Sequence, residues 1–434
     1  MVWVEKVTYG STVLAETYCL AASKATPLTF HLGDSVSRFR KVSTCRVDHF
    51  VNFFARLPLF SKEPSWRLRA SIVEGLMFVP ELERAALNHG LPYRQQGTYL
   101  EYIPLTWTTC NNAANFGLPT DIVVKMMVIS MLNFQIDKWF EDITGDERLN
   151  KDFGALRGVI RQLFDDGAEP MVEYPRPYRD RLLRNPPIPT SDGSRKADLL
   201  HEGDSTLSRF VEYVLSHLSF ALPCSLRRRV MHELSIFLQA HVTQGEDSSL
   251  IALQDRRPVS CQVFAGVRST YYDWVRATSA DHTSCPYSFE LFRCLVSDSI
   301  CGGIDCFSGA RTQYLAQDVC RHLATICRQH NDYGSVARDQ EQNNLNSVNF
   351  PEFHGEDSKP EDEKQAGDKA KKTLLAMANY EQECLELAVK KLRQEIQAPA
   401  WKAWEVFINV TIIYGQIYLL QDINADSRKP IEAG

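Results

Sequence analysis

The sequence predicts an all-α protein in which one set of helices surrounds an apolar interior. From residue 47 onward, most segments repeat their apolar residues every three or four positions, the period of an amphipathic helix. No long strand-like alternation appears, and no glycine-rich turn marks a βαβ unit. With 434 residues, of which 44% are hydrophobic, the chain is long enough to bury a large core. These observations favour a single helical bundle over an α/β nucleotide-binding fold.

Charge and composition limit the classes of partner. The formal net charge of −6 argues against nucleic acid as a main partner. No apolar run reaches the roughly 18 to 20 residues that a membrane span needs, and the first residues lack the basic start and apolar core of a secretory signal. The 12 cysteines show no metal-binding spacing. We therefore expect a cytoplasmic protein with no membrane span; its oligomeric state is open, with a homodimer as one option.

The chain divides into an N-terminal segment, 1–90, and a main domain, 91–424. Residues 2–14 are strand-like, whereas residues 47–87 have helical periodicity, so we expect the N-terminal segment to be partly helical and packed on the bundle. A turn-rich stretch around Pro92 separates the two parts.

The most apolar predicted helix is 122–143, which is hydrophobic nearly all round and therefore belongs in the interior. It ends with two acids four residues apart, Asp137 and Glu141. These carboxylates oppose the helix dipole there. They form either a metal site or a solvent-exposed end in which Lys138 pairs with Asp142.

A second acidic string competes for the same role. Asp165, Asp166 and Glu169 match a generic DDxxE pattern more closely. However, Gly167 and Pro170 break a helix there, and a metal site needs carboxylates on a rigid element. Both alternatives stay open at the level of sequence, with 137 and 141 preferred.

Helical periodicity then returns in the second half of the chain. The predicted helices cover 206–222, 225–242, 260–278, 373–397 and 400–420. Between two of them, residues 352–372 are charged and of low complexity, which predicts a mobile charged loop, either a lid or a plain solvated loop.

Three oxygen-bearing residues recur every fourth position near the middle of this half. Asn331, Ser335 and Asp339 fall on one face of a helix. Amide, hydroxyl and carboxylate oxygens are hard ligands of the kind that Mg²⁺ accepts while keeping some of its waters. Arg338 stands beside Asp339 and could reach an anion held by such a metal. The alternative is a polar helix start that faces water, capped by Asn331 or Asp332.

This stretch carries a family resemblance. Asn331-Asp332-xx-Ser335-xxx-Asp339, with the following NNLNSVNFPEF, resembles the second metal-binding motif of class I terpene synthases, with Asp339 where Glu is more usual. The amino-acid sequence of this stretch is most similar to the C-terminal catalytic domain of fungal diterpene synthases of the copalyl diphosphate/ent-kaurene type. The resemblance implies a single-domain class I terpenoid synthase bundle around a deep apolar cavity. Two departures weaken it: Lys138 replaces a second aspartate, and Ile413-Tyr414 replaces an Arg-Tyr pair.

The resemblance also assigns roles to residues. It implies three Mg²⁺ ions, with Mn²⁺ as a substitute, held by Asp137, Glu141, Asn331, Ser335 and Asp339. Arg276, ahead of a kinked helix, corresponds to the diphosphate sensor, with Ser279 and Ala280 at the linker and effector positions, and Arg338 adds further donors. Aromatic faces that could stabilise a carbocation in the cavity are Phe134, Trp274, Tyr333, Trp404 and Tyr414.

The function implied is that of a class I terpene cyclase. Such an enzyme ionises an allylic isoprenoid diphosphate, here geranylgeranyl diphosphate, and cyclises the carbocation to a diterpene. The D-x-D-D acid of class II cyclisation is absent and the chain is short, so we expect a stand-alone class I enzyme. The alternatives are a copalyl-type, C15 or C25 diphosphate as substrate, a chain-elongating prenyltransferase, or a catalytically dead helical interaction protein.

Overall fold

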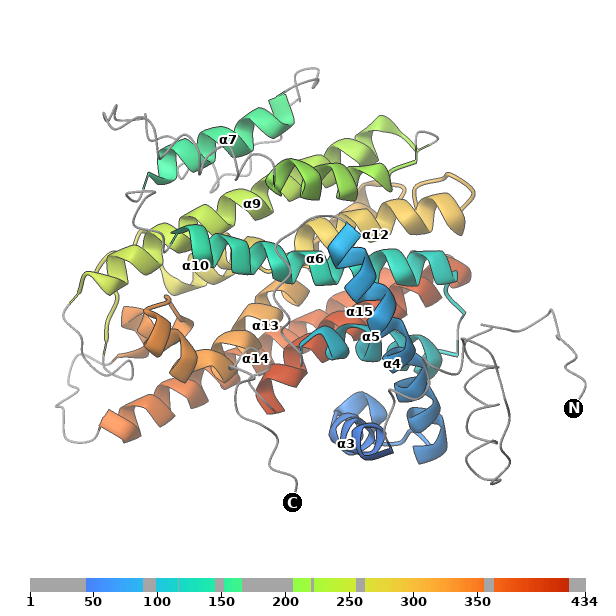
Figure 1. Ribbon diagram of the computed structural model, residues 1–434, viewed down its shortest axis with the longest axis horizontal. Coiled ribbons are helices and arrows are strands. Elements are labelled where there is room, and N and C mark those ends of the chain that lie inside the picture. Colours follow the sequence, from blue (N-terminus) through green and yellow to red (C-terminus); the bar gives the residue numbers. More distant parts are fainter. Residues whose placement is uncertain are drawn as a thin grey trace, which may run out of the picture.

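The computed structural model describes residues 44–88, 99–115, 117–144, 152–165, 206–219, 222–254, 262–354 and 363–420. All regular secondary structure in these ranges is helical, and most of the helices lie side by side in one bundle (Figure 1). The predicted all-α fold is therefore confirmed for the part of the chain that the structure describes.

In its described residues, 44–88, the N-terminal segment contributes two α-helices to the bundle. α3 (Thr44–Phe54) and α4 (Ser65–Asn88) pack together, and α5 (Tyr99–Ala113) lies along α4. Phe54 and Tyr102 are fully buried where these helices meet. The strand-like stretch 2–14 lies outside the described residues.

α6 (Thr120–Thr144) and α9 (Cys224–Ala252) pack closely at one end. A Cβ atom on Gly245 of α9 would lie 2.8 Å from Cγ2 of Thr144, so only glycine allows this approach. α7 (Phe153–Asp165) lies along α9 at the edge of the bundle (Figure 1). Residues 206–216 form a further helix.

The predicted helix 260–278 is shorter than expected and broken. α10 (Tyr271–Arg276) begins only at Tyr271, and residues 262–270 are not helical. Ala277, with φ −114° and ψ −97°, separates α10 from α11 (Thr278–His282). Ser284, in the left-handed region at φ 48°, then separates α11 from α12 (Cys285–Ser299). The chain is thus kinked twice just after Arg276.

The last three helices pack against one another. α13 (Ala310–Gln342) contacts both α14 (Glu363–Arg393) and α15 (Ala398–Leu420) (Figure 1). At Gly334 the backbones of α13 and α15 come so close that a Cβ atom would lie 2.4 Å from the carbonyl oxygen of Tyr418. The segment with Asn331, Ser335 and Asp339 is therefore fixed against a rigid neighbour.

The expected charged loop at 352–372 needs a correction. Residues 351–353 form a short 3₁₀ helix, and α14 already begins at Glu363, so residues 363–372 are helical. Alanine, lysine and glutamine there are strong helix formers, and Ala370 is buried, which gives this helix an apolar stripe. Residues 355–362 lie outside the described part.

α15 also departs from expectation, because it is long and apolar enough to cross a membrane by length and composition. In the bundle, 56% of its most apolar window is buried, and Trp404, Ile413 and Ile417 are fully enclosed. That burial is typical of a core helix.

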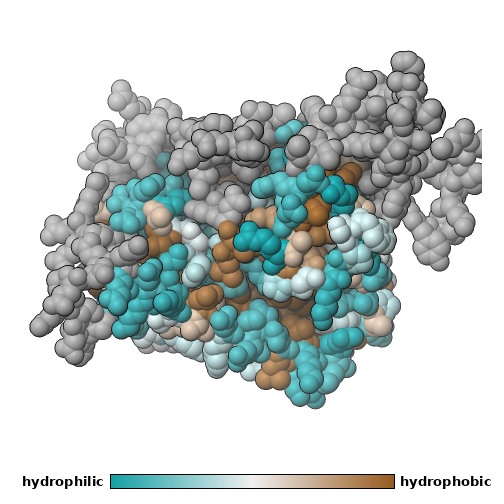
Figure 2. Space-filling model, turned by 90° about the horizontal axis from the view of Figure 1, so that it is seen from below, coloured by the Kyte–Doolittle hydropathy of each residue, from teal (hydrophilic) through white to brown (hydrophobic). Residues whose placement is uncertain are grey.

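One face of the molecule is mixed in polarity. Seen from below, the described residues show apolar patches divided by polar side chains (Figure 2). This mixture is typical of amphipathic helices whose broader apolar stripes face the interior.

Candidate functional site

A cavity of about 680 Å³ lies within the bundle, with walls from α5, α6, α9, α13, α15 and the break between α11 and α12. Asp137 and Glu141 line it from α6, and Asn331 and Asp339 line it from α13. The two oxygen-ligand sets, far apart in the sequence, therefore meet at one cavity.

The remaining walls are largely apolar. The large apolar and aromatic side chains among them are Trp107, Met126, Phe134, Phe407, Val410 and Tyr414. Burial raises the pKa of the Tyr414 hydroxyl, so this group stays neutral at ordinary pH. A site with charged groups beside apolar walls suits a ligand that has one anionic and one hydrocarbon end.

On the side of the cavity formed by Asp137 and Glu141, here called the α6 edge, each carboxylate has a basic partner. Asp137 Oδ1 lies 3.0 Å from Nε2 of His241, which belongs to α9. Glu141 forms an ion pair with Lys138 one turn earlier on α6. The Asp137 and Glu141 side chains are 40% and 45% exposed, so both remain accessible from the cavity.

On the opposite ligand set, Asn331 and Asp339 of α13, here called the α13 edge, the carboxylate of Asp339 is buried. Ser335 Oγ donates to Asp339 Oδ2 at 2.6 Å, and Asn346 Nδ2 donates to the same oxygen at 2.8 Å. Burial raises the pKa of Asp339 to about 6, and nearby Asp332 adds to the increase, while Arg338 and the two hydrogen bonds oppose it. Ser335 is fully buried and does not line the cavity, so it acts on the site through Asp339.

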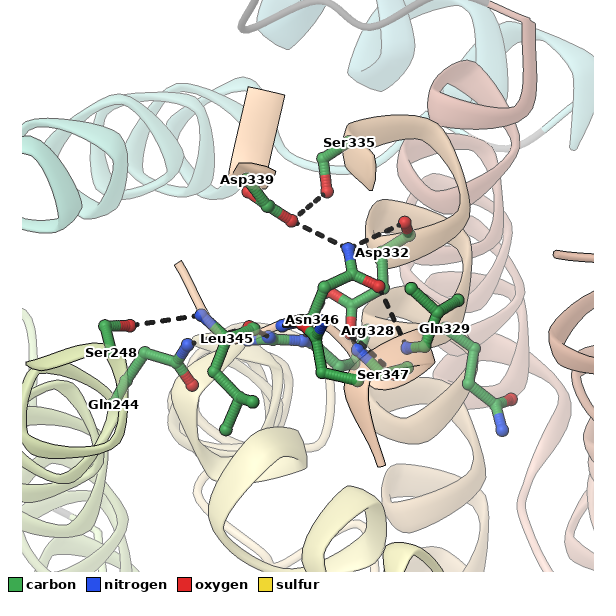
Figure 3. A network of polar contacts seen from close by, with 12 residues as sticks. Gln244, Ser248, Arg328, Gln329, Asp332, Ser335, Asp339, Leu345, Asn346 and Ser347 are labelled. Carbon is green, nitrogen blue, oxygen red and sulfur yellow. Dashed lines mark hydrogen bonds and ion pairs between the residues drawn. The ribbon is translucent and has the colours of Figure 1, made fainter. Parts of the chain in front are cut away.

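Asp332 joins this edge to the segment that follows α13 (Figure 3). Its Oδ2 accepts hydrogen bonds from the backbone N–H and the hydroxyl of Ser347, at 2.9 and 2.6 Å. Its Oδ1 lies 2.7 Å from Nε of Arg328, and its backbone carbonyl accepts from Asn346 at 2.9 Å. Asp332 therefore holds the segment after α13 in place and is not a metal ligand, although it belongs to the same motif as the predicted ligands.

The same segment is also tied to α9. Gln244 Nε2 donates to the carbonyl oxygen of Leu345 at 3.1 Å, and the Leu345 N–H donates to Ser248 Oγ at 3.3 Å (Figure 3). Asn343 ends α13 in the left-handed conformation, at φ 56°, and this turns the chain back toward α9.

Among the residues that the structure describes, two arginines line the cavity, and the sequence predicted one of them. Arg338 was predicted. Arg328 was missed, although it stands three residues before Asn331 on the same face of α13. Arg276 does not line the cavity: it pairs with Glu381 of α14 and lies 4.9 Å from the ring centroid of Tyr272.

The other predicted positions divide between cavity and core. Phe134 and Tyr414 line the cavity. Trp274 packs on Phe350, Tyr333 lies under Lys371, and Trp404 is enclosed by Phe289, Phe292 and Phe307. Ser279 and Ala280 are fully buried, and the residues from His282 to Cys285 line the cavity in their place.

The rival acidic string has little structural description. Asp166 and Glu169 lie outside the described residues, and Asp165 is the last residue of α7. No described residue of α7 lines the cavity.

The donor chemistry of the cavity fits a hard cation. Asp137, Glu141 and Asp339 offer carboxylate oxygens and Asn331 offers an amide oxygen, the kind of ligand that Mg²⁺ prefers. Within the described ranges, no group of three or more His, Cys, Asp or Glu side chains could by itself hold a metal ion. A cation here would therefore share its coordination with water and with oxygen atoms of a ligand, as Mg²⁺ commonly does beside phosphates.

Comparisons with known proteins point to one group. No family model matches the chain. It is 36% identical over 449 residues to a pimaradiene synthase of Emericella nidulans, which covers 96% of this chain and 43% of that protein. It is 32% identical to an ent-kaur-16-ene synthase of Phaeosphaeria sp., over 98% of this chain and 44% of that protein. It is 31% identical to a phyllocladan-16-alpha-ol synthase of Phomopsis amygdali, over 100% of this chain and 45% of that protein.

A solved structure of hedycaryol synthase is 15% identical, with a TM-score of 0.44 over 79% of this chain and 92% of that one, a likeness too distant to support an argument. The similarity to the curated proteins agrees with the resemblance seen in the segment from Asn331 to Phe353. This chain is therefore a homologue of the fungal diterpene synthases, over a stretch that makes up less than half of their length.

Proposed function

We propose that this chain is a class I terpene cyclase, which converts an allylic isoprenoid diphosphate into a cyclic terpene and releases diphosphate. The observation that carries the proposal is the meeting of two oxygen-ligand sets, on α6 and α13, at one cavity with apolar walls. The similarity to diterpene synthases supports geranylgeranyl diphosphate as the substrate.

The residues that would hold Mg²⁺ are Asp137 and Glu141 on one side and Asn331 and Asp339 on the other. Bound Mg²⁺ would neutralise the charge that develops on the diphosphate as the allylic C–O bond breaks. Ser335 donates a hydrogen bond to Asp339 and so orients its carboxylate. A carboxylate whose pKa is about 6 is mostly ionised at pH 7, as a ligand requires.

The basic residues of the cavity would bind the diphosphate. Arg328 and Arg338 both line the cavity, and a guanidinium matches the geometry of phosphate oxygens. Arg328 is held in place by Asp332 and by the ring of Trp274, 5.1 Å from its guanidinium carbon. Together the two arginines would orient the leaving group toward the metal ligands.

The apolar walls would fold the hydrocarbon chain and exclude water from the carbocation. Phe134, Trp107, Phe407 and Tyr414 offer aromatic faces, which stabilise positive charge without reacting with it. A volume of about 680 Å³ lies within the roughly 300 to 1,000 Å³ of small-molecule sites.

The test is incubation of the purified chain with Mg²⁺ and, separately, C15, C20 and C25 allylic diphosphates and a copalyl-type diphosphate. We expect a cyclic C20 hydrocarbon or alcohol by mass spectrometry, only with metal present. A longer linear diphosphate as product would indicate a chain-elongating prenyltransferase. No turnover of any of these substrates by the folded protein would contradict the proposal and favour a helical interaction protein.

A further inference from the structure

The carboxylate of Asp137 is accessible on one side only. Its side chain is 40% exposed, yet its Oδ1 atom is buried, so the exposure belongs to the Oδ2 side that faces the cavity. Nε2 of His241 lies 3.0 Å from this Oδ1 atom. Among the described residues, neither of these two buried atoms has a hydrogen-bond partner of regular geometry, so the 3.0 Å contact between them is an ion-pair contact.

The imidazole of His241 is itself held rigidly. Its side chain is 1% exposed. It stacks on Phe140, with ring centroids 4.7 Å apart, and meets the edges of Phe237 at 4.6 Å and His282 at 4.1 Å. Rings on three sides leave His241 little freedom to turn away from Asp137.

The packing of α6 on α9 explains why the two groups meet. Gly245 lies one turn after His241 on α9, and its missing Cβ lets α9 approach the end of α6 at Thr144. Because His241 and Gly245 share one face of α9, this approach also brings the imidazole against Asp137.

We propose that His241 is a positioning residue, which holds Oδ1 of Asp137 so that Oδ2 points into the cavity toward a divalent cation. This inference rests on the proposed function and extends it to a residue outside the metal-binding motifs. Groups that orient a metal ligand from behind typically change metal affinity by about 10- to 100-fold when they are removed. His241 would have that role for a carboxylate.

The experiment compares two substitutions of similar shape. His241→Gln keeps an N–H near the position of Nε2, whereas His241→Met fills similar space without a donor. The readout is binding of Mn²⁺ in the presence of inorganic diphosphate, followed through the loss of the free Mn²⁺ signal in electron paramagnetic resonance. We expect His241→Met to weaken binding about 10- to 100-fold and His241→Gln to stay within about threefold of the wild type.

A double-mutant cycle separates positioning from a general structural effect. If His241 acts through Asp137, His241→Met should change binding very little once Asp137→Ala is present. Thermal unfolding shows whether each variant is folded. If His241→Met does not fold, His241→Phe takes its place in the cycle, since it keeps the ring contacts and removes the donor.

The outcomes separate this inference from the proposed function. Equal Mn²⁺ binding by His241→Gln and His241→Met would overturn the positioning role alone. So would a loss of Mn²⁺ affinity on His241→Met that is the same in the wild-type and Asp137→Ala backgrounds. If Asp137→Ala binds Mn²⁺ and diphosphate as the wild type does, the metal site itself is refuted, and the positioning role is refuted with it.

Discussion

The α6 edge of the cavity presents half-exposed carboxylates, each beside one basic group, whereas the α13 edge presents a buried carboxylate that accepts two hydrogen bonds from neutral side chains and lies 3.7 Å from the guanidinium of Arg338. Asp137 and Glu141 are 40% and 45% exposed and lie beside His241 and Lys138. Asp339 is 8% exposed and receives its hydrogen bonds from a serine and an asparagine.

This difference separates function from stability. A half-exposed acid contributes little to the free energy of unfolding, because water screens its ion pair. A buried acid with several hydrogen bonds affects the fold as well as the chemistry. Substitutions on α6 should therefore report on catalysis alone, and substitutions on α13 should report on both.

The largest effect should come from Asp137→Ala, which we expect to abolish measurable turnover while leaving the thermal unfolding midpoint close to that of the wild type. The reason is that this carboxylate offers its exposed side to the cavity and makes few contacts that stabilise the fold. The measurement is steady-state turnover of geranylgeranyl diphosphate with saturating Mg²⁺.

Asp165→Ala and Asp166→Ala are the matched controls and should keep most of the activity. The reverse pattern, in folded variants, would move the first metal site to the rival acidic string and break the comparison between the two edges.

Asp339→Asn should lower turnover roughly 100-fold or more, because it removes the one formal charge among Asn331, Ser335 and Asp339. The amide can still accept from Ser335, so we expect the fold to persist. The Mg²⁺ concentration needed for half-maximal rate should rise. Asp339→Glu restores the residue more usual in the resembled family and should retain activity. Near wild-type turnover by Asp339→Asn, with unchanged Mg²⁺ dependence, would show that this face of α13 holds no metal.

Asn346→Ala should reduce the free energy of unfolding by about 2 to 4 kcal/mol, because it removes the two buried hydrogen bonds that this side chain donates to the Asp332 carbonyl and to the Asp339 carboxylate. Lys138→Ala on the α6 edge should change it by less than about 1 kcal/mol, since that ion pair is partly exposed. Chemical denaturation of both variants measures the contrast. Equal losses would mean that the two edges do not differ in stability.

The smallest effect concerns pH. Because the pKa of Asp339 is raised to about 6 in the folded state, the folded chain binds more protons than the unfolded chain between about pH 4 and 6. The contribution of Asp339 to the free energy of unfolding is therefore present at low pH and is lost as the pH rises toward 6. In the wild type this titration should lower the free energy of unfolding by roughly 1 to 3 kcal/mol between pH 4 and pH 7, and Asp339→Asn should abolish that loss. Denaturation curves at pH 4, 5, 6 and 7 test it; parallel pH profiles would contradict it.

Helical periodicity was sufficient to predict the fold class and the helix that carries Asp137, and residue spacing was sufficient to bring Asn331 and Asp339 to one face. Neither periodicity nor spacing was sufficient to predict where the side chain of Arg276 lies. Its partner Glu381 lies 105 residues away on α14, and no local pattern tells which face of α10 that helix will cover.

Aromatic residues show the same limit. Trp404 and Tyr414 lie ten residues apart on α15, yet one is enclosed in the core and the other lines the cavity. Their side-chain chemistry is similar, so only the packing of neighbouring helices separates them. His241 was missed for a related reason: a histidine on an apolar helix face predicts no partner until α6 and α9 are placed together.

The return of the chain after α13 has a consequence for the order of folding. Asp332 bonds to Asn346 and Ser347 across loops of only 14 and 15 residues, whereas Asp137 and His241 are about 100 residues apart. Closing the longer loop costs roughly 2 kcal/mol more in chain entropy. Short-range contacts form first when such costs decide the sequence of events. The α13 edge should thus be structured in the folding transition state, with the α6 edge completed afterwards, when the distant helices of the bundle dock.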